Sequence, residues 1–329
     1  MIQSPALTTG VYGPTAGCAM PEHYASTART YHSDMDFPAV APAHGLISRR
    51  RFLALSAAAG GAAVLAACGG GGSAESGDEL AVVQRFSNSG LVPGDVRLPI
   101  SLADKNGILG NDATKKFGTL NASVKDLVSG KTVIESVSAE KHGADFTYPY
   151  WPFTVRIDAP GTYSLVVEGG SPDGGAFQIL DPATVEMPYV GAKLPPFDTP
   201  TVKDPRGVDP VCTLTPEPCP FHDVTLTDAL ASGKKVAYLI GTPAHCKTGT
   251  CAPALTGLMA EAKALGDTVV FVHAEVYKDQ SATTLAPAVE AYKLQFEPIL
   301  FVAGTGGTVT HRLDGVFDAA EIRSVLSSL

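Results

Sequence analysis

Basic side chains are scarce in this sequence. Its 329 residues hold 24 Lys and Arg against 33 Asp and Glu, which gives a net charge of −9 at pH 7. A protein that binds nucleic acid through its phosphates needs an excess of clustered positive charge. We therefore expect no nucleic acid among the partners of this protein.

Long apolar runs and cysteine are also in short supply. The Ala- and Gly-rich run over residues 54–67 is too short for a transmembrane helix, which needs ~20 apolar residues. Only six cysteines occur, and four of them form two close pairs, Cys212/Cys219 and Cys246/Cys251. Close pairs of this kind are typical of disulfides in proteins outside the cytoplasm.

Residues 48–68 resemble a bacterial export signal. Ser48-Arg-Arg-Arg-Phe-Leu53 matches the twin-arginine pattern, and Leu65-Ala-Ala-Cys68 resembles a lipoprotein box. The resemblance implies twin-arginine export, lipidation of Cys68, and an extracytoplasmic protein that is lipid-anchored to the cell membrane. Gly-rich residues 69–79 then form a flexible tether. Residues 1–47 are expected to be disordered, or to be an extension that results from a wrongly assigned start site.

Residues 80–182 show short runs of period two that are broken by turn residues, which is typical of strands. Examples are 96–102, 153–157, 162–167 and 176–180. Pro160-Gly161 marks a turn between two of them. We expect an all-β sandwich that resembles immunoglobulin or fibronectin domains and acts as a spacer or docking module. Tyr148, Tyr150 and Trp151 are interpreted as core or turn packing rather than as a ligand-binding patch.

Residues 183–222 are rich in proline and predict an extended linker that ends in a loop with Cys212 and Cys219. A structural disulfide between these two cysteines is the preferred interpretation. Metal binding is the alternative, because His222 lies three residues beyond Cys219. A zinc site takes four ligands, and a second cluster at a suitable spacing is missing from the sequence.

Residues 223–329 alternate between helical and extended patterns. The predicted order is helix 226–232, strand 235–240, helix 253–265, strand 268–274, helix 283–294, strands 299–303 and 309–313, and helix 318–328. Gly306-Gly307 indicates a hairpin turn, and Asp318 with Glu321 predicts a capping box for the last helix. The expected fold class is α/β, with a central sheet flanked by helices.

This order of elements, together with Cys246 and Cys251 between a strand and a helix, resembles the thioredoxin-like superfamily over about residues 223–329. The resemblance implies that Pro298, in Phe296-Glu-Pro-Ile-Leu-Phe-Val302, is a cis-proline opposite the reactive cysteines. The cysteine spacing departs from that family, because four residues separate the two cysteines instead of two. At this spacing the side chains diverge on a regular helix, so a bond between them requires a loop over 247–250.

The two cysteines predict thiol chemistry at a helix start. A thiolate there is stabilised by the helix N-terminus. We expect Cys246 to attack, with His245 and Lys247 lowering its pKa, and Cys251 to resolve the mixed disulfide. The clients would be thiols and disulfides of other exported proteins, and no cofactor is expected.

Two alternatives remain open at this stage. Sco-type copper chaperones are similar in being membrane-anchored proteins with a cysteine pair and a histidine, and that resemblance implies Cys246, Cys251 and His245 as copper ligands, with His273 and His311 as the other histidines considered. The second alternative is a non-catalytic lipoprotein with two static disulfides.

Overall fold

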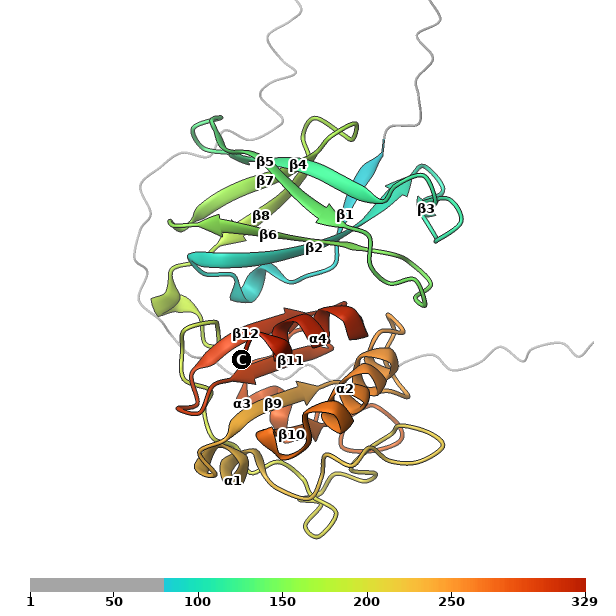
Figure 1. The fold of residues 1–329 in the computed structure, drawn as a ribbon, viewed down its shortest axis with the longest axis vertical. Coiled ribbons are helices and arrows are strands. Elements are labelled where there is room, and N and C mark those ends of the chain that lie inside the picture. The colour runs from blue at the N-terminus through green and yellow to red at the C-terminus, as the bar shows by residue number, and fades with distance from the viewer. Residues whose placement is uncertain (1–79) are drawn as a thin grey trace, which may run out of the picture. The chain divides into compact units, whose positions relative to one another are not determined.

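The computed structural model describes residues 80–329 (Figure 1), which belong to one compact unit. The predictions for 1–47, for the export signal 48–68 with lipidation of Cys68, and for the tether 69–79 lie outside the described residues. Within the described part, no helix is both long enough and apolar enough to cross a bilayer.

The first half of the described chain is built from two antiparallel four-stranded sheets. In one sheet β2 pairs with three strands, which are β1, β3 and β6. The other has the order β5-β4-β7-β8. The strands are β1 (Ala81–Gln84), β2 (Gly94–Asp104), β3 (Gly107–Ile108), β4 (Thr119–Asp126), β5 (Thr132–Glu140), β6 (Trp151–Ile157), β7 (Gly161–Val167) and β8 (Gly175–Ile179).

Strict alternation places the apolar residues of both sheets in one core. In β6 the side chains of Trp151, Phe153, Val155 and Ile157 are buried, while the polar residues between them are exposed. They pack with residues of β4, β7 and β8 in a single cluster. This arrangement is consistent with the expected β-sandwich. Trp151 is fully buried in that core, and its indole N–H donates to the carbonyl of Gly118 at 2.9 Å.

The Pro-rich segment that follows is packed against the rest of the chain rather than free. Apart from a short 3-10 helix, Pro182–Thr184, residues 183–225 hold no helix or strand. Met187 and Leu194 are nevertheless buried in a core shared with the next sheet. The Tyr292 hydroxyl donates to the carbonyl of Pro195. The expected linker is therefore a packed strap, because its few apolar side chains find partners.

The third sheet has the order β10-β9-β11-β12. Its strands are β9 (Lys235–Ile240), β10 (Val269–Ala274), β11 (Ile299–Ala303) and β12 (Val309–Asp314). Strands β9 and β10 run parallel, whereas β11 is antiparallel to both of its neighbours. All five residues of β11 are buried, as expected for a central strand covered on both faces.

Four helices accompany this sheet, and they are α1 (Leu226–Ala231), α2 (Cys251–Leu265), α3 (Pro287–Ala291) and α4 (Ala319–Ser327). Alternate residues of β9 enter two different cores. One core holds Tyr238 with residues of α1 and α3, and the other holds Leu239 with residues of α2 and α4. The helices therefore cover both faces of the sheet (Figure 1).

Two helices differ from the sequence prediction. Helix α3 is much shorter than the predicted 283–294, because Pro287 starts it and Lys293 adopts a positive φ of 52° just beyond its end. Helix α4 has only half of the expected capping box. Asp318 accepts from the Glu321 amide at 3.0 Å, but the Glu321 carboxylate turns away to bind Arg97.

Candidate functional site

Cys246 and Cys251 lie on either side of a tight loop between β9 and α2. Gly249 adopts a φ of 68°, and its amide donates to the carbonyl of Cys246 at 3.1 Å, which turns the chain back toward the helix. Cys251 is the first residue of α2, so it lies at the helix start as expected. The loop brings the two sulfurs and a carboxylate oxygen of Glu297 within 4.8 Å of one another. Both cysteines are free thiols in this structure.

The sulfur of Cys246 is partly exposed and lies near two threonine hydroxyls. It lies 3.2 Å from Oγ1 of Thr248 and 3.9 Å from Oγ1 of Thr250. The Cys251 thiol, the Thr248 hydroxyl and the amides of Cys251 and Thr250 lower the pKa of Cys246 to about 4, against the opposing effect of partial burial. Cys246 is therefore a thiolate at neutral pH.

The second sulfur, on Cys251, has the opposite environment. Cys251 is 1% exposed, and burial is the main reason that its pKa is raised far above the ordinary range. Its thiol donates to Oε2 of Glu297 at 3.4 Å, and the Thr242 amide donates to the same oxygen at 2.8 Å. Burial, and the negative charge on Cys246, raise the pKa of Glu297 to about 7. A carboxylate that exchanges protons near neutral pH thus contacts the buried thiol.

Pro298 lies beside this carboxylate, and the Glu297–Pro298 peptide bond is cis in the structure. Gly241, at the end of β9, completes the base of the site. A Cβ atom there would lie 3.2 Å from Cβ of Pro298 and 3.5 Å from Sγ of Cys251. A side chain at position 241 would therefore press on Pro298 and touch the buried thiol.

His245 is not one of the groups that lower the pKa of Cys246. Its ring instead packs edge-on against Tyr277, with the centroids 6.2 Å apart. Nε2 of His245 is buried without a hydrogen-bond partner in the structure. Lys247 is exposed on the loop. The groups that lower the pKa of Cys246 are instead the Cys251 thiol, the Thr248 hydroxyl and the amides of Cys251 and Thr250.

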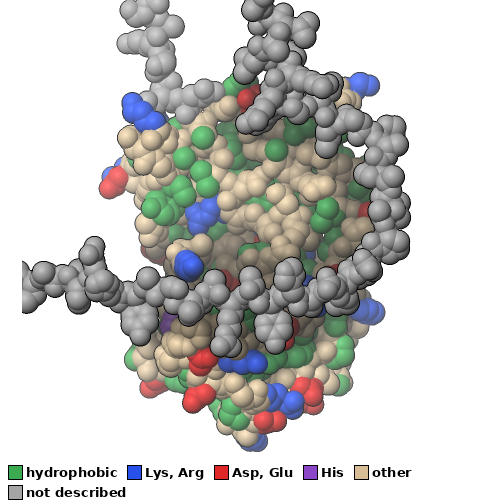
Figure 2. Space-filling view, turned by 180° about the vertical axis from the view of Figure 1, so that it is seen from behind, with side chains coloured by type: hydrophobic (Ala, Val, Ile, Leu, Met, Phe, Trp, Pro, Cys, Tyr) green, Lys and Arg blue, Asp and Glu red, His purple; other side chains and the backbone are tan. Residues whose placement is uncertain are grey.

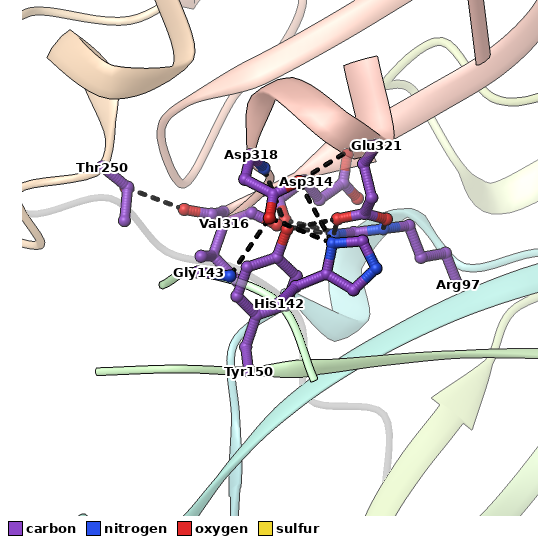
Figure 3. A network of polar contacts seen from close by, with 10 residues as sticks. Arg97, His142, Gly143, Tyr150, Thr250, Asp314, Val316, Asp318 and Glu321 are labelled. Carbon is purple, nitrogen blue, oxygen red and sulfur yellow. Dashed lines mark hydrogen bonds and ion pairs between the residues drawn. The ribbon is translucent and has the colours of Figure 1, made fainter. Parts of the chain in front are cut away.

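A polar network ties this loop to the sandwich (Figure 3). The Thr250 hydroxyl donates to the carbonyl of Gly315 at 2.9 Å, just after β12. Close by, the buried Arg97 side chain of β2 donates to the Glu321 carboxylate at 2.8 and 2.7 Å and to the carbonyl of Val316 at 2.6 Å. The helix start at Cys251 is thereby connected to a buried ion pair.

Tyr150 and His142 extend the network from the sandwich side. The Tyr150 hydroxyl donates to Glu321 at 2.6 Å and accepts from the amide of Asp318 at 2.8 Å. His142 lies 3.0 Å from the Asp318 carboxylate. That contact raises the pKa of His142, and hydrogen bonds from His142 and from the amides of Glu321 and Gly143 lower the pKa of Asp318 to about 2, against the opposing effect of burial. Tyr150 is therefore a buried structural group, as interpreted from the sequence, while Tyr148 is exposed.

The second cysteine pair lies in a different environment. Cys212 and Cys219 are buried free thiols in this structure, so the disulfide expected between them stays a prediction for the oxidised protein. Their sulfurs, a nitrogen of His222 and a nitrogen of His273 all lie within 4.8 Å of one another. From the sequence alone, His273 is a candidate only for the copper alternative near Cys246. Its position beside Cys212 follows from the fold, because β10 carries it there.

Two surface features complete the description. A pocket of about 300 Å³ beside Glu297 is lined mainly by apolar side chains, among them Val276, Leu285, Val289 and Phe296. On the face shown in Figure 2, acidic and basic side chains are interspersed toward the lower end.

A search against protein-family models found no match, and neither did a search of curated proteins.

Proposed function

We propose that this protein is a membrane-anchored, extracytoplasmic thiol–disulfide exchange protein in which Cys246 attacks and Cys251 resolves. The observation that carries the proposal is the asymmetry of the two thiols. Cys246 is accessible and has a pKa of about 4, whereas Cys251 is buried, within reach of Cys246, and has a raised pKa. An accessible thiolate beside a buried resolving thiol is the arrangement that exchange chemistry requires.

A thioredoxin-like fold for residues 223–329 is part of this proposal. It is supported by the sheet order β10-β9-β11-β12, by the parallel β9/β10 pair with two antiparallel partners, and by helices on both faces. An immunoglobulin-like spacer or docking module is the proposed assignment of the sandwich. Export and lipid anchoring rest on residues 48–68 and Cys68 of the sequence.

The first chemical step needs only Cys246. Its thiolate attacks one sulfur of a client disulfide, a bond forms between Cys246 and that sulfur, and the other client sulfur leaves as a thiolate. Hydroxyl and amide donors around Cys246 stabilise its thiolate before the reaction. A thiol with an ordinary pKa near 8.5 would be mostly protonated at pH 7 and would react more slowly.

The second step needs Cys251 and a proton acceptor. The thiol of Cys251 passes its proton to Glu297 and attacks the sulfur of Cys246. A Cys246–Cys251 bond forms, the bond to the client breaks, and the client leaves with its second sulfur as a thiolate. Two electrons pass from the protein to the client. Oxidation of a client uses the same steps in reverse.

The apolar pocket beside Glu297 supports an extended client segment as substrate. Leu285 is 45% exposed at this pocket, although most of the leucines in the described chain are buried. A client peptide that covers it would bury apolar surface next to the reacting sulfurs.

The copper alternative receives less support from the contacts. A Cu(I) site of the expected kind needs an imidazole near both thiols, and His245 packs on Tyr277 instead. The third potential ligand beside Cys246 and Cys251 is the carboxylate of Glu297, which is a hard oxygen donor. Such a set suits Cu(I) poorly.

The proposal is tested by a redox titration of the full chain with Cys18→Ser and Cys68→Ser. The protein is equilibrated in glutathione buffers of stepped potential, alkylated, and mapped by mass spectrometry for each cysteine pair separately. We expect Cys246 and Cys251 to reduce reversibly between about −100 and −270 mV, the range of exchange proteins. We also expect Cys246 to be alkylated first.

The matched control is Cys246→Ser in the same background, which should abolish exchange with a model disulfide while the Cys212/Cys219 pair behaves as before. A Cys246–Cys251 bond that resists reduction until the fold is lost would mark a static disulfide. Stoichiometric Cu(I) binding that depends on Cys246, without exchange activity, would favour the copper alternative.

A further inference from the structure

A buried group of four side chains lies apart from the exchange site, in the strap and at the end of β10. Cys212, Cys219 and His222 come from the strap segment before α1, and His273 comes from β10. All four are buried, with exposures of 4, 5, 2 and 0%. Each offers one sulfur or nitrogen, and these four atoms lie within 4.8 Å of one another.

Two of the distances within the group are close to those between ligands around one small cation. Zn–S bonds of ~2.3 Å and Zn–N bonds of ~2.0–2.1 Å in a tetrahedron put the ligand atoms roughly 3.3–3.8 Å apart. In the structure, Sγ of Cys219 lies 3.5 Å from Nδ1 of His273, and Nε2 of His222 lies 3.1 Å from the same nitrogen. The two rings meet edge-on, with their centroids 5.0 Å apart.

The hydrogen bonding of His273 fixes which of its nitrogens faces the group. Nε2 lies 2.9 Å from the carbonyl of Gly241, and a carbonyl only accepts, so Nε2 carries a proton. In the neutral ring Nδ1 then presents a lone pair toward Cys219 and His222. An outer N–H bound to a backbone carbonyl is the usual support of a metal-binding histidine.

Backbone amides donate hydrogen bonds to both sulfurs. The Cys219 amide donates to Sγ of Cys212 at 3.3 Å, and the Phe221 amide is hydrogen bonded to the sulfur of Cys219. Amide donors directed at sulfur are compatible with metal-bound cysteines. Two thiolates and two neutral imidazoles would cancel the charge of a divalent cation, so that a filled site would bury no net charge.

We propose that Cys212, Cys219, His222 and His273 form a structural zinc site. Tetrahedral S2N2 sets of cysteine and histidine with no open position are typical of structural zinc. The ion would join the strap to β10 and, through His273, to Gly241 at the base of the exchange site. The site involves neither Cys246 nor Cys251, and the inference stands independently of the proposed exchange activity.

The test uses the full chain with Cys18→Ser and Cys68→Ser, reduced, stripped with chelator and dialysed against zinc chloride. We expect one zinc per chain by elemental analysis. Adding Cys246→Ser and Cys251→Ser should leave that stoichiometry unchanged, whereas adding Cys212→Ser and Cys219→Ser should abolish it. Co²⁺ in place of zinc should give the intense visible bands of a tetrahedral site and a thiolate charge-transfer band.

His222→Gln, with His311→Gln as the matched control, tests the histidine ligands and guards against a cysteine variant that fails to fold. His222→Gln should lose zinc, while His311→Gln should retain it. In the parent protein, zinc should also slow the alkylation of Cys212 and Cys219 at least tenfold, without slowing that of Cys246.

Several outcomes would overturn the proposal. Zinc binding that is lost with Cys246→Ser and Cys251→Ser would do so, as would Co²⁺ spectra of an octahedral site. Binding of Cu(I) in place of zinc, or a Cys212–Cys219 disulfide in protein purified without air, would also contradict it.

Discussion

The thiol of Cys251 donates a hydrogen bond of 3.4 Å to Oε2 of Glu297. The pKa of this carboxyl is about 7, raised mainly by burial, so it exists in both protonation states under physiological conditions. The contact gives a buried, weakly acidic thiol a nearby base. The two steps of the proposed exchange therefore differ in their need for a base. Attack by Cys246 does not need Glu297, whereas attack by Cys251 does, because Cys251 must first pass its proton to Glu297.

Glu297→Gln should slow resolution and spare attack. The amide cannot accept the proton of Cys251, and loss of a general base typically costs about 100-fold or more in rate. The measurement is the decay of a Cys246–glutathione mixed disulfide, followed by acid quench and mass spectrometry. Glu290→Gln on α3, where the side chain is exposed, is the control. An unchanged decay rate would remove Glu297 from the mechanism.

The reactivity of Cys246 should be nearly constant over the neutral range and fall only in acid. Its pKa of about 4 lies below the ordinary value, so the thiolate dominates above that pH and is lost as pH falls through it. Rates of iodoacetamide alkylation of Cys246 from pH 3 to 9 would show the transition. A midpoint near 8.5 would contradict the assignment.

Thr248→Val should shift this midpoint upward. The variant removes a hydroxyl that lies 3.2 Å from the sulfur and favours its charged form. Thr256→Val, on the exposed side of α2, changes the same chemical group away from the sulfur and should leave the midpoint in place. Equal midpoints in the two variants would show that Thr248 does not stabilise the thiolate.

The contributions of Arg97 and Glu321 to the free energy of unfolding should be strongly coupled. Both side chains are 12% exposed, and removing one partner of a buried pair leaves an uncompensated charge, at a cost of about 3 kcal/mol or more. We expect Arg97→Met and Glu321→Gln each to lower the free energy of unfolding in urea by about this amount, and the double variant to lose less than the sum.

Arg156→Met is the control for that cycle. Arg156 also contacts carboxylates, those of Asp95 and Asp158, but it is 66% exposed, and exposed pairs contribute about 0–1 kcal/mol. If Arg97→Met cost no more than Arg156→Met, the buried pair would not hold the sandwich against α4.

His142 should stabilise the fold most below neutral pH. Its pKa is raised by Asp318, so the protonated form contributes stability that is complete below about 6.5 and is lost as pH rises through the higher folded value. Asp318, with a pKa of about 2, stays charged throughout this range. The difference in unfolding free energy between the parent and His142→Gln should therefore shrink from pH 5.5 to 9. A constant difference would exclude the ion pair as its source.

Local patterns predicted the elements of the third sheet well. Strands 235–240 and 299–303 lie where they were expected, because continuous apolar runs mark central strands. The Gly306-Gly307 turn joins β11 to β12, as the glycines indicated. The loop over 247–250 follows from the cysteine spacing alone. Helix α3 was overpredicted, since periodicity does not show where tertiary packing ends a helix.

Contacts between distant parts of the chain could not be predicted from the sequence. Cys219 and His273 are 54 residues apart, and Arg97 and Glu321 are 224 apart. Nothing local to the strap segment points to β10, so a fourth ligand appeared to be missing. The position of Glu297 beside Cys251 could not be predicted for a related reason. Its carboxylate reaches Cys251 only because β11 lies beside β9.

The burial of Cys251 limits the chemical forms that the protein can take during a reaction. Gly241 lies beside this sulfur, Glu297 accepts a hydrogen bond from it, and only 1% of the residue is exposed. In the proposed exchange reaction, a client sulfur would therefore reach Cys246 alone. Each trapped complex is then a single positional isomer, so a client captured by a Cys251→Ser variant can be assigned to one bond without separating mixtures.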